Sequence, residues 1–457
     1  MAELSFPPLP VVAAVAMGYG HLRAAHAVAG ALGVEIVHVD RPPIAPAEEQ
    51  RLWQASRRFY EMTSRASQLP VVGAPLRVFL DGLTRIPHLY PYRDLSDATV
   101  EAVSLARMIQ KGLGRGLAAY LRETGRPLLT TFYASAISAD HYGCSPVYCV
   151  VTDSDIHRIW VPVHPERSRI VYLAPTRRAV KRLSAYGVAR EQIELTGFPL
   201  PHELLGGPDL PVLKRNLAAR LVRLDRKKVF RSQTRNEIQH FLGGGLPDDQ
   251  EGRPPLATFS VGGAGAQASL ARSLLRSLKP LLEEGRLRLC LVAGVRQGIA
   301  GKFHDWIEEA GLGKHLGPVD RAGVSVEVAD SIETYFPRFN QLLAETDILW
   351  TKPSEMTFFA ALGIPLVLTP PVGHHERYNR RWAIENGGGL KQRHPDYAGF
   401  WIREWLAEGT LAAAAWFGFL RFPKFGLYQI LDRIGAPRPG SMALAAQALE
   451  PQSVAAR

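Results

Sequence analysis

Cysteine is scarce in this 457-residue sequence, which contains only Cys144, Cys149 and Cys290. Three cysteines among apolar neighbours are too few for a disulfide framework or a structural zinc site. No stretch reaches the roughly 18 consecutive apolar residues that span a bilayer, and the N-terminal segment lacks the basic start of a signal peptide. These absences predict a reduced, cytoplasmic protein without a transmembrane helix.

Acidic residues are outnumbered, because 43 Asp and Glu stand against 54 Lys and Arg, which gives a formal net charge of +11. A basic surface attracts anions, which include nucleic acids, anionic membranes and phosphorylated substrates. The sequence shows no Cys/His finger spacing, no aromatic RNA-binding signature and no helix-turn-helix pattern, so nucleic acid is not an expected partner. With 46% hydrophobic residues, the chain has enough apolar material for folded cores.

Short apolar runs alternate with helix-periodic segments along most of the chain, which is typical of doubly wound parallel sheets. Strands are expected at 11–16, 34–39, 128–132, 147–152, 169–173, 193–195, 257–261, 287–293, 347–351 and 364–368. A stretch rich in Pro, Gly and charge after residue 200 separates two such halves. We expect an α/β protein with two Rossmann-like domains facing a central cleft. Its parts are an N-terminal domain at 1–205, a basic linker or insert at 206–255, a C-terminal domain at 256–400 and a helical segment with a tail at 401–457.

A histidine stands at the first strand end of the N-terminal half. His21 follows a strand and opens a helix, with Gly18 and Gly20 in the same turn. Ligands bind outside the carboxyl ends of the strands in such sheets. An imidazole titrates near neutral pH, which suits removal of a proton from a hydroxyl group. A capping or core histidine would produce the same pattern.

A second polar cluster follows the strand expected at 147–152. It contains Asp153, His157 and Trp160. Asp153 could orient a catalytic group or hold the hydroxyl groups of an acceptor. The Asp–His spacing lacks the third and fourth ligands of a metal site, so no metal is expected.

The C-terminal half carries a glycine-rich turn at its first strand end, with Gly262, Gly263 and Gly265. Glycines between a strand and a helix let backbone N–H groups approach an anion such as a phosphate. A tight turn without a ligand is equally consistent with this pattern, and the Lys-Ser/Thr of a Walker loop is absent. Two later strand ends of the same half carry further polar side chains: Lys352, Ser354, Glu355, His375, Glu376 and Asn379.

The order of these motifs resembles that of GT-B glycosyltransferases, most closely the group of monogalactosyldiacylglycerol synthase and MurG. The motifs are Gly-x-Gly-His-x-x-Ala-Ala, Val-Thr-Asp-x-x-x-His-x-x-Trp, Leu-Thr-Gly-Phe-Pro, Gly-Gly-x-Gly, Asp-Ile-Leu-Trp-Thr-Lys-Pro, Gly-x-Pro, His-Glu-x-x-Asn and Gly-Gly-Gly. Each is short, but together they run in order from about residue 11 to residue 389, with the 201–255 stretch outside the likeness.

The resemblance implies roles for several residues. His21 corresponds to the general base of the group, with Asp153 beside it as a second catalytic residue. Gly262, Gly263 and Gly265 correspond to its diphosphate-binding loop. The remaining donor contacts would come from Lys352, Ser354, Glu355, His375, Glu376 and Asn379, and the acceptor side from Gly18, Gly20, His157 and Trp160.

Two departures indicate a divergent member. Phe358 stands where the group has a ribose-binding Glu, and Glu355, one turn earlier, is the candidate replacement. The Lys-Pro-Gly-Gly of the group is Lys-Pro-Ser-Glu here, from Lys352 onward.

Two stretches bear on the acceptor. A predicted basic amphipathic helix suits an anionic membrane surface, although a helix packed on its own domain fits equally well. Its basic residues are Arg220, Arg223, Arg226, Lys227, Lys228 and Arg231. The aromatic and basic stretch 416–425 resembles an interfacial segment, or the C-terminal helix that crosses back to the first domain in GT-B folds.

The sequence therefore predicts transfer of a sugar from a nucleotide-diphosphate sugar, with a UDP-sugar favoured, to a hydroxyl group of a lipid-linked acceptor. The resemblance implies inversion at the anomeric carbon, with neither metal nor cofactor. The expected location is cytoplasmic and peripheral at the inner face of the membrane. Two alternatives stay open: a nucleotide-sugar 2-epimerase of the same fold, and an inactive nucleotide-sugar-binding protein.

Overall fold

The N-terminal half contains one parallel six-stranded sheet. The computed structural model describes residues 8–66, 86–243, 246, 253–262, 265, 267–371 and 373–439. The strand order is β2-β1-β3-β4-β5-β6. The strands are β1 (Val11–Ala14), β2 (Ile36–His38), β3 (Leu128–Thr130), β4 (Val147–Val150), β5 (Val171–Ala174) and β6 (Ile193–Leu195).

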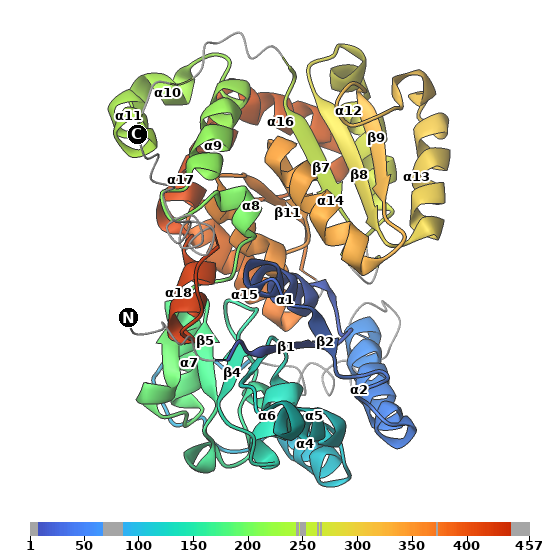
Figure 1. Cartoon of the computed structure of the whole chain (residues 1–457). Coiled ribbons are helices and arrows are strands. Elements are labelled where there is room, and N and C mark those ends of the chain that lie inside the picture. The colour runs from blue at the N-terminus through green and yellow to red at the C-terminus, as the bar shows by residue number, and fades with distance from the viewer. Residues whose placement is uncertain are drawn as a thin grey trace, which may run out of the picture.

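A second parallel six-stranded sheet forms the C-terminal half, in the order β12-β11-β10-β7-β8-β9. Its strands are β7 (Leu256–Ser260), β8 (Arg288–Gly294), β9 (Val324–Val328), β10 (Ile348–Thr351), β11 (Leu366–Leu368) and β12 (Gly389–Lys391). Each predicted strand is found within a few residues of its expected bounds, whereas β9 and β12 were not predicted. Helices flank both sheets, and the two halves lie one above the other in Figure 1.

Helices connect the strands of both halves. In the N-terminal half they are α1 (Tyr19–Leu32), α2 (Ala47–Ala66), α4 (Val100–Gln110), α5 (Arg115–Thr124), α6 (Tyr133–His141) and α7 (Arg177–Ala185), with the short 3₁₀ helices η1 (Arg158–Trp160), η2 (Pro165–Arg167) and η3 (Arg190–Gln192). Beyond β6 come α8 (His202–Leu205), α9 (Pro211–Leu224), α10 (Val229–Gln233), α11 (Arg235–Leu242), α12 (Leu270–Glu283), α13 (Gln297–Glu309), η4 (Gly313–His315), α14 (Ile332–Glu345), η5 (Glu355–Leu362), α15 (His374–Glu385), η6 (Pro395–Tyr397), α16 (Ala398–Ala407), α17 (Thr410–Arg421) and α18 (Gly426–Arg433). None of the helices in the described ranges has the length and apolar content needed to pass through a bilayer.

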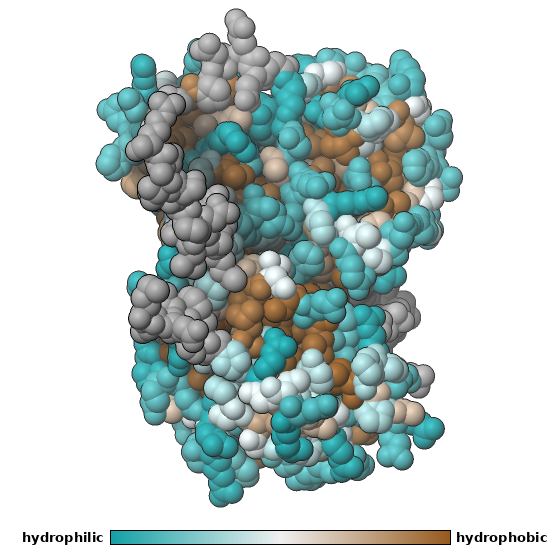
Figure 2. Space-filling model, in the orientation of Figure 1, coloured by the Kyte–Doolittle hydropathy of each residue, from teal (hydrophilic) through white to brown (hydrophobic). Residues whose placement is uncertain are grey.

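The N-terminal sheet buries both of its faces, but in two different cores. Successive side chains of a strand point to opposite faces. Val12 and Ala14 join a core that continues into the C-terminal half, while Val11 and Ala13 belong to a second core inside the N-terminal half. The two halves therefore share buried apolar surface. Figure 2 shows hydrophobic residues gathered near this junction, over α1 and β1.

The chain crosses back to the first domain at its C-terminal end, as the GT-B resemblance predicts. A Cβ on Gly426, the first residue of α18, would lie 2.2 Å from the carbonyl oxygen of Phe198, so the helix start touches the backbone beyond β6. Arg433 pairs with Glu194, and the Tyr428 hydroxyl lies 3.0 Å from His202 Nδ1. The two sheets and this crossing confirm the predicted fold class.

The aromatic stretch 416–425 does not form an exposed interfacial surface. It comprises the end of α17 and the loop leading to α18. Of its aromatic side chains, Trp416, Phe419 and Phe422 are buried, Phe417 is half-buried and Phe425 is exposed. The rings pack inside the C-terminal half because α17 approaches η5 so closely that a Cβ on Gly418 would lie 2.4 Å from the carbonyl oxygen of Ala360.

The expected basic face is corrected in part. Three of its arginines are buried, whereas Arg226, Lys227 and Lys228 are exposed. Arg220 is 1% exposed and donates hydrogen bonds to the carbonyl oxygens of Thr346, Leu362 and Gly363. Arg223 is buried against Asp347, and Arg231 is buried against Asp225. The helix packs on its own half of the molecule, which was the alternative interpretation of the sequence.

Candidate functional site

His21 lies at the junction of the two halves, in the first turn of α1. Its Nδ1 is 2.6 Å from the carbonyl oxygen of Thr131, which can only accept a hydrogen bond, so Nδ1 carries the proton. The Thr152 hydroxyl is 3.3 Å from the same nitrogen. None of the described residues forms a hydrogen bond with Nε2. That nitrogen is therefore the basic one in the neutral imidazole.

The surroundings of the His21 ring keep it neutral. Burial lowers the pKa of His21 below its usual range, and the negative charge of Asp153 only partly offsets this effect. Aromatic side chains surround the ring, with the Phe132 ring centroid at 5.0 Å and the Trp160 ring centroid at 6.0 Å. Trp160, which the sequence assigned to the acceptor side, thus lies beside His21, while His157 lies half-buried at the start of η1.

Asp153 is joined to the C-terminal half through Asn379. Asn379 Nδ2 donates to Asp153 Oδ1 at 3.0 Å, and the Ser154 N–H donates to Asn379 Oδ1 at 2.8 Å. Asn379 is completely buried. Asp153, expected on the acceptor side, thus contacts Asn379, expected on the donor side. Both polar groups of the Asn379 amide form hydrogen bonds with the N-terminal half.

The glycine turn of the C-terminal half lies under a lysine. A Cβ on Gly262 would lie 2.4 Å from Lys352 Cε, so a larger residue at this position would require the lysine side chain to move. Lys352 Nζ donates to Glu376 Oε1 at 2.9 Å. Gly265 adopts a φ of +68°, which also favours glycine. Gly263 lies outside the described residues. The turn, Lys352 and Glu376 are thus brought together at the carboxyl edge of the sheet.

Glu355 faces α1. Its Oε1 is 3.6 Å from Arg23 Nε, and its Oε2 lies 3.3 Å from where a Cβ on Gly20 would be. Its backbone neighbour Ser354 precedes η5 and donates its N–H to the carbonyl oxygen of Lys352. Gly18, with φ of +126°, begins α1.

Phe358 is 3% exposed and its ring stacks on Phe198 at 4.7 Å, while the Trp382 ring lies 5.2 Å away on α15. The place of the group's ribose-binding Glu is thus filled by apolar packing. His375 completes the predicted set from the first turn of α15, near enough to lower the pKa of His21.

Sequence reasoning missed four residues of this junction. Thr131 and Thr152 hold the His21 ring, and Tyr19 and Arg23 join α1 to the C-terminal half. The Tyr19 hydroxyl accepts a hydrogen bond from the N–H of Val295 at 3.3 Å. The i, i+4 spacing of Tyr19 and Arg23 was the available signal, because it places both on one face of the helix.

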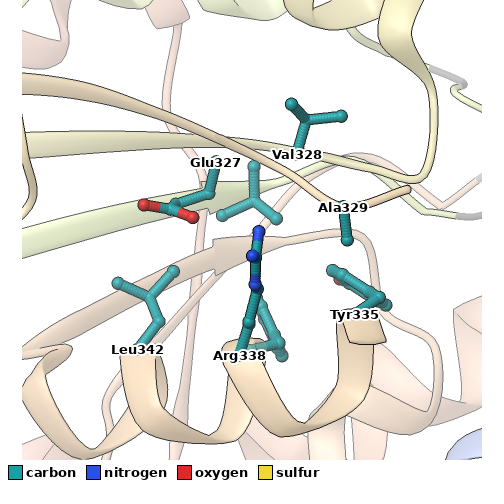
Figure 3. A pocket seen from close by; sticks show the side chains of 8 residues that line it. Glu327, Val328, Ala329, Tyr335, Arg338 and Leu342 are labelled. Atoms are coloured by element: carbon teal, nitrogen blue, oxygen red, sulfur yellow. The ribbon is translucent and has the colours of Figure 1, made fainter. Parts of the chain in front are cut away.

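A separate hollow lies between β9 and α14 and contains none of the predicted site residues. Figure 3 shows Glu327 and Arg338 reaching into it among apolar side chains. Burial raises the pKa of Glu327, and Arg338 partly offsets that effect. Within the described ranges, no three His, Cys, Asp or Glu side chains gather where they could hold a metal ion.

A family model described as a domain of unknown function (DUF6938) matches residues 249–394. Comparison with curated proteins gives no match. Solved structures with similarity include MurG from Acinetobacter baumannii, at 14% identity over 93% of this chain and 99% of that chain, with a TM-score of 0.48. The UDP-GlcNAc 2-epimerase from Neisseria meningitidis bound to UDP-GlcNAc is 11% identical over 93% of this chain and 98% of that chain, with a TM-score of 0.44. S. aureus MnaA in a co-structure with UDP is 12% identical over 93% and 95%, with a TM-score of 0.47.

Proposed function

We propose that this protein transfers a sugar from a UDP-sugar to a hydroxyl group of an acceptor, with His21 as the general base. The observation that carries the proposal is the His21 ring. Its Nδ1–H is committed to the Thr131 carbonyl oxygen, and burial keeps the imidazole neutral. The ring lies beside Thr131 and Thr152, which follow the carboxyl ends of β3 and β4, and such folds bind their ligands at this edge.

The reaction needs one proton acceptor on the acceptor side. His21 Nε2 takes the proton of the acceptor hydroxyl while its oxygen attacks the anomeric carbon of the sugar. The bond from that carbon to the diphosphate oxygen breaks, and UDP leaves with the electron pair. Attack opposite the leaving group inverts the anomeric carbon. A proton transfer of this kind contributes about 100- to 10,000-fold to a rate.

The donor belongs on the C-terminal half in this proposal. Lys352 covers Gly262, and Arg296 lies against Gly265 of the same turn, so two cations border it. A lysine and backbone N–H groups stabilise the charge that develops on a departing diphosphate, which is the requirement at this position. Glu376 holds Lys352 in place until the donor arrives. The choice of UDP follows from the sequence resemblance.

The nature of the acceptor is a further part of the proposal. The buried arginines of α9 and α10 and the buried rings of the stretch 416–425 do not face solvent, whereas Arg226, Lys227 and Lys228 are exposed between α9 and α10. The net charge of +11 remains in favour of a lipid-linked acceptor at an anionic membrane surface. Flotation with anionic vesicles at low and high salt measures whether the protein binds an anionic membrane surface.

The experiment compares His21→Ala with the unchanged protein. We expect the rate of UDP release in the presence of acceptor to fall about 100- to 10,000-fold, while calorimetry shows UDP affinity unchanged. His164→Ala, an exposed histidine of the same half, is the matched control and should keep the full rate.

Two outcomes would contradict the proposal. A His21→Ala variant with more than half of the original rate removes His21 from the chemistry. Incubation with the donor alone separates the alternatives, because a 2-epimerase produces a new sugar epimer without acceptor, whereas a binding protein leaves the donor unchanged.

A further inference from the structure

One face of α1 is docked on α14 of the C-terminal half. Tyr19, Arg23 and His26 follow the i, i+4, i+7 spacing that lines one side of a helix. The Tyr19 ring lies 5.3 Å from the Tyr335 ring, and the His26 ring lies 5.4 Å from the Phe336 ring. His21 is two residues before Arg23, about 200° around the helix, so it faces the N-terminal sheet. The helix that carries His21 is thus held from its opposite side by the other half.

Arg23 is the centre of this contact. Its side chain is 3% exposed, and its guanidinium lies 4.7 Å from the ring centroids of both Phe336 and Phe339. The rings of Tyr335, at 5.8 Å, and Phe359, at 5.4 Å, complete an aromatic cage. Planar guanidinium groups are attracted to the faces of such rings.

A charge in this cage needs an explanation. Among the described residues, Nε and Nη1 of Arg23 have no hydrogen-bond partner. Burying a cation without hydrogen bonds is unfavourable, and an apolar side chain would fill the same space at lower cost. Unlike an apolar side chain, the guanidinium attracts the Glu355 carboxylate. Arg23 Nε lies 3.6 Å from Glu355 Oε1.

Glu355 connects this charge to the first turn of α1. Its other oxygen lies against Gly20, the residue before His21, in a space that a Cβ would enter at 3.3 Å. The negative charge of Glu355 also raises the pKa of His21, against the larger effect of burial. Arg23 therefore holds the Glu355 carboxylate of the C-terminal half against Gly20, the residue before His21.

We propose that Arg23, acting through Glu355, is a positioning residue that fixes α1 and His21 relative to the C-terminal half. The expected fall in kcat rests on the proposed function, whereas the expected change in the distance between the halves does not. It also gives Glu355 a role other than the ribose contact that the sequence suggested. Neither residue needs to touch the substrate for this role.

The structural test requires no enzymatic activity. Spin labels on cysteines introduced at the exposed positions Glu123 on α5 and Lys302 on α13 report the distance between the halves, since the native cysteines are buried. Arg23→Met should broaden the distance distribution or move it to longer distances. Arg51→Met, at an exposed arginine on α2 of the same half, is the matched control and should leave it unchanged.

The kinetic test uses the same variants and adds Arg23→Lys, which keeps the charge if Arg23→Met fails to fold. We expect kcat to fall at least tenfold in Arg23→Met and less in Arg23→Lys, with UDP affinity within twofold of the original. Glu355→Gln should lower kcat similarly and add little to Arg23→Met in the double variant, because the two residues act as a unit.

The outcomes separate the two proposals. Altered distances in a protein without transferase activity support the positioning role and reject the proposed function. Unchanged distances and unchanged kcat in Arg23→Met overturn the positioning role while leaving the function intact. A tenfold loss of UDP affinity in Glu355→Gln assigns Glu355 to the nucleotide and overturns its role as the partner of Arg23.

Discussion

At the scale of single residues, the protonation of His21 is decided by its neighbours. The Thr131 carbonyl oxygen accepts a hydrogen bond from Nδ1–H, which leaves Nε2 to act as the base. Burial opposes the imidazolium form, and Asp153 favours it. A base of this kind stays unprotonated at neutral pH and is lost only when the medium becomes acidic.

This balance gives a pH prediction. Protonation of His21 removes the base, so kcat/KM should fall toward acid, with a midpoint below the usual imidazole value of about 6.5. Asp153→Asn removes the anion that raises the pKa of His21, so the acid limb should move to still lower pH. The measurement is a pH–rate profile of both proteins. Asp305→Asn, exposed on α13, is the control, and an acid limb that stays in place in Asp153→Asn would show that Asp153 does not act on His21.

The sequence predicts the surroundings of some of these residues better than those of others. A turn between a strand and a helix places His21 at a sheet edge, which local spacing is enough to predict. The Arg23 cage depends on α14 and η5, more than 300 positions further along the chain, and nothing in the local pattern of α1 predicts which residues will face it. The neighbours of Phe358 were equally hidden, because stacking on Phe198 requires the two halves to be in contact.

At the scale of elements, α9 shows why a charge pattern alone can mislead. Arginines at helical spacing suggest a solvated or membrane-facing surface, yet the guanidinium of Arg220 satisfies carbonyl groups at the ends of α14 and η5. Those carbonyl groups have no intrahelical partner because they lie at helix C-termini. The arginine therefore connects three elements of the C-terminal half.

Removing this connection should destabilise the protein. Arg220→Met leaves four buried carbonyl oxygens without this donor, and at about 1 kcal/mol or more each this should lower the free energy of unfolding by at least about 4 kcal/mol. Arg215→Met, exposed on the same helix, should change it by no more than about 0.5 kcal/mol. Urea unfolding of the two variants measures the difference. Equal stabilities would mean that water or a rearranged side chain replaces the guanidinium.

At the scale of the whole molecule, the two halves share one hydrophobic core, in addition to the separate core inside the N-terminal half. One face of the N-terminal sheet, α1, α18 and the C-terminal sheet belong to a single hydrophobic core. Domains joined only by a small polar interface can unfold independently, whereas a shared core requires that exposing one half also exposes apolar surface of the other. The cleft predicted between two independent Rossmann-like domains is thus bridged by packing, by the Arg23 cage and by Asn379.

The shared core predicts how a ligand should affect unfolding. We expect one cooperative thermal transition, and a nucleotide that binds the C-terminal half should move all of it, because stabilising one half stabilises the other. Binding adds RT ln(1 + [L]/Kd), about 2.7 kcal/mol at 100 times Kd. Calorimetric scans with UDP, GDP, ADP and dTDP sugars would show which nucleotide binds, with a UDP-sugar expected to give the largest shift. Two transitions, only one of which responds to the nucleotide, would show that the halves unfold separately and that the apolar contact between them contributes little to stability.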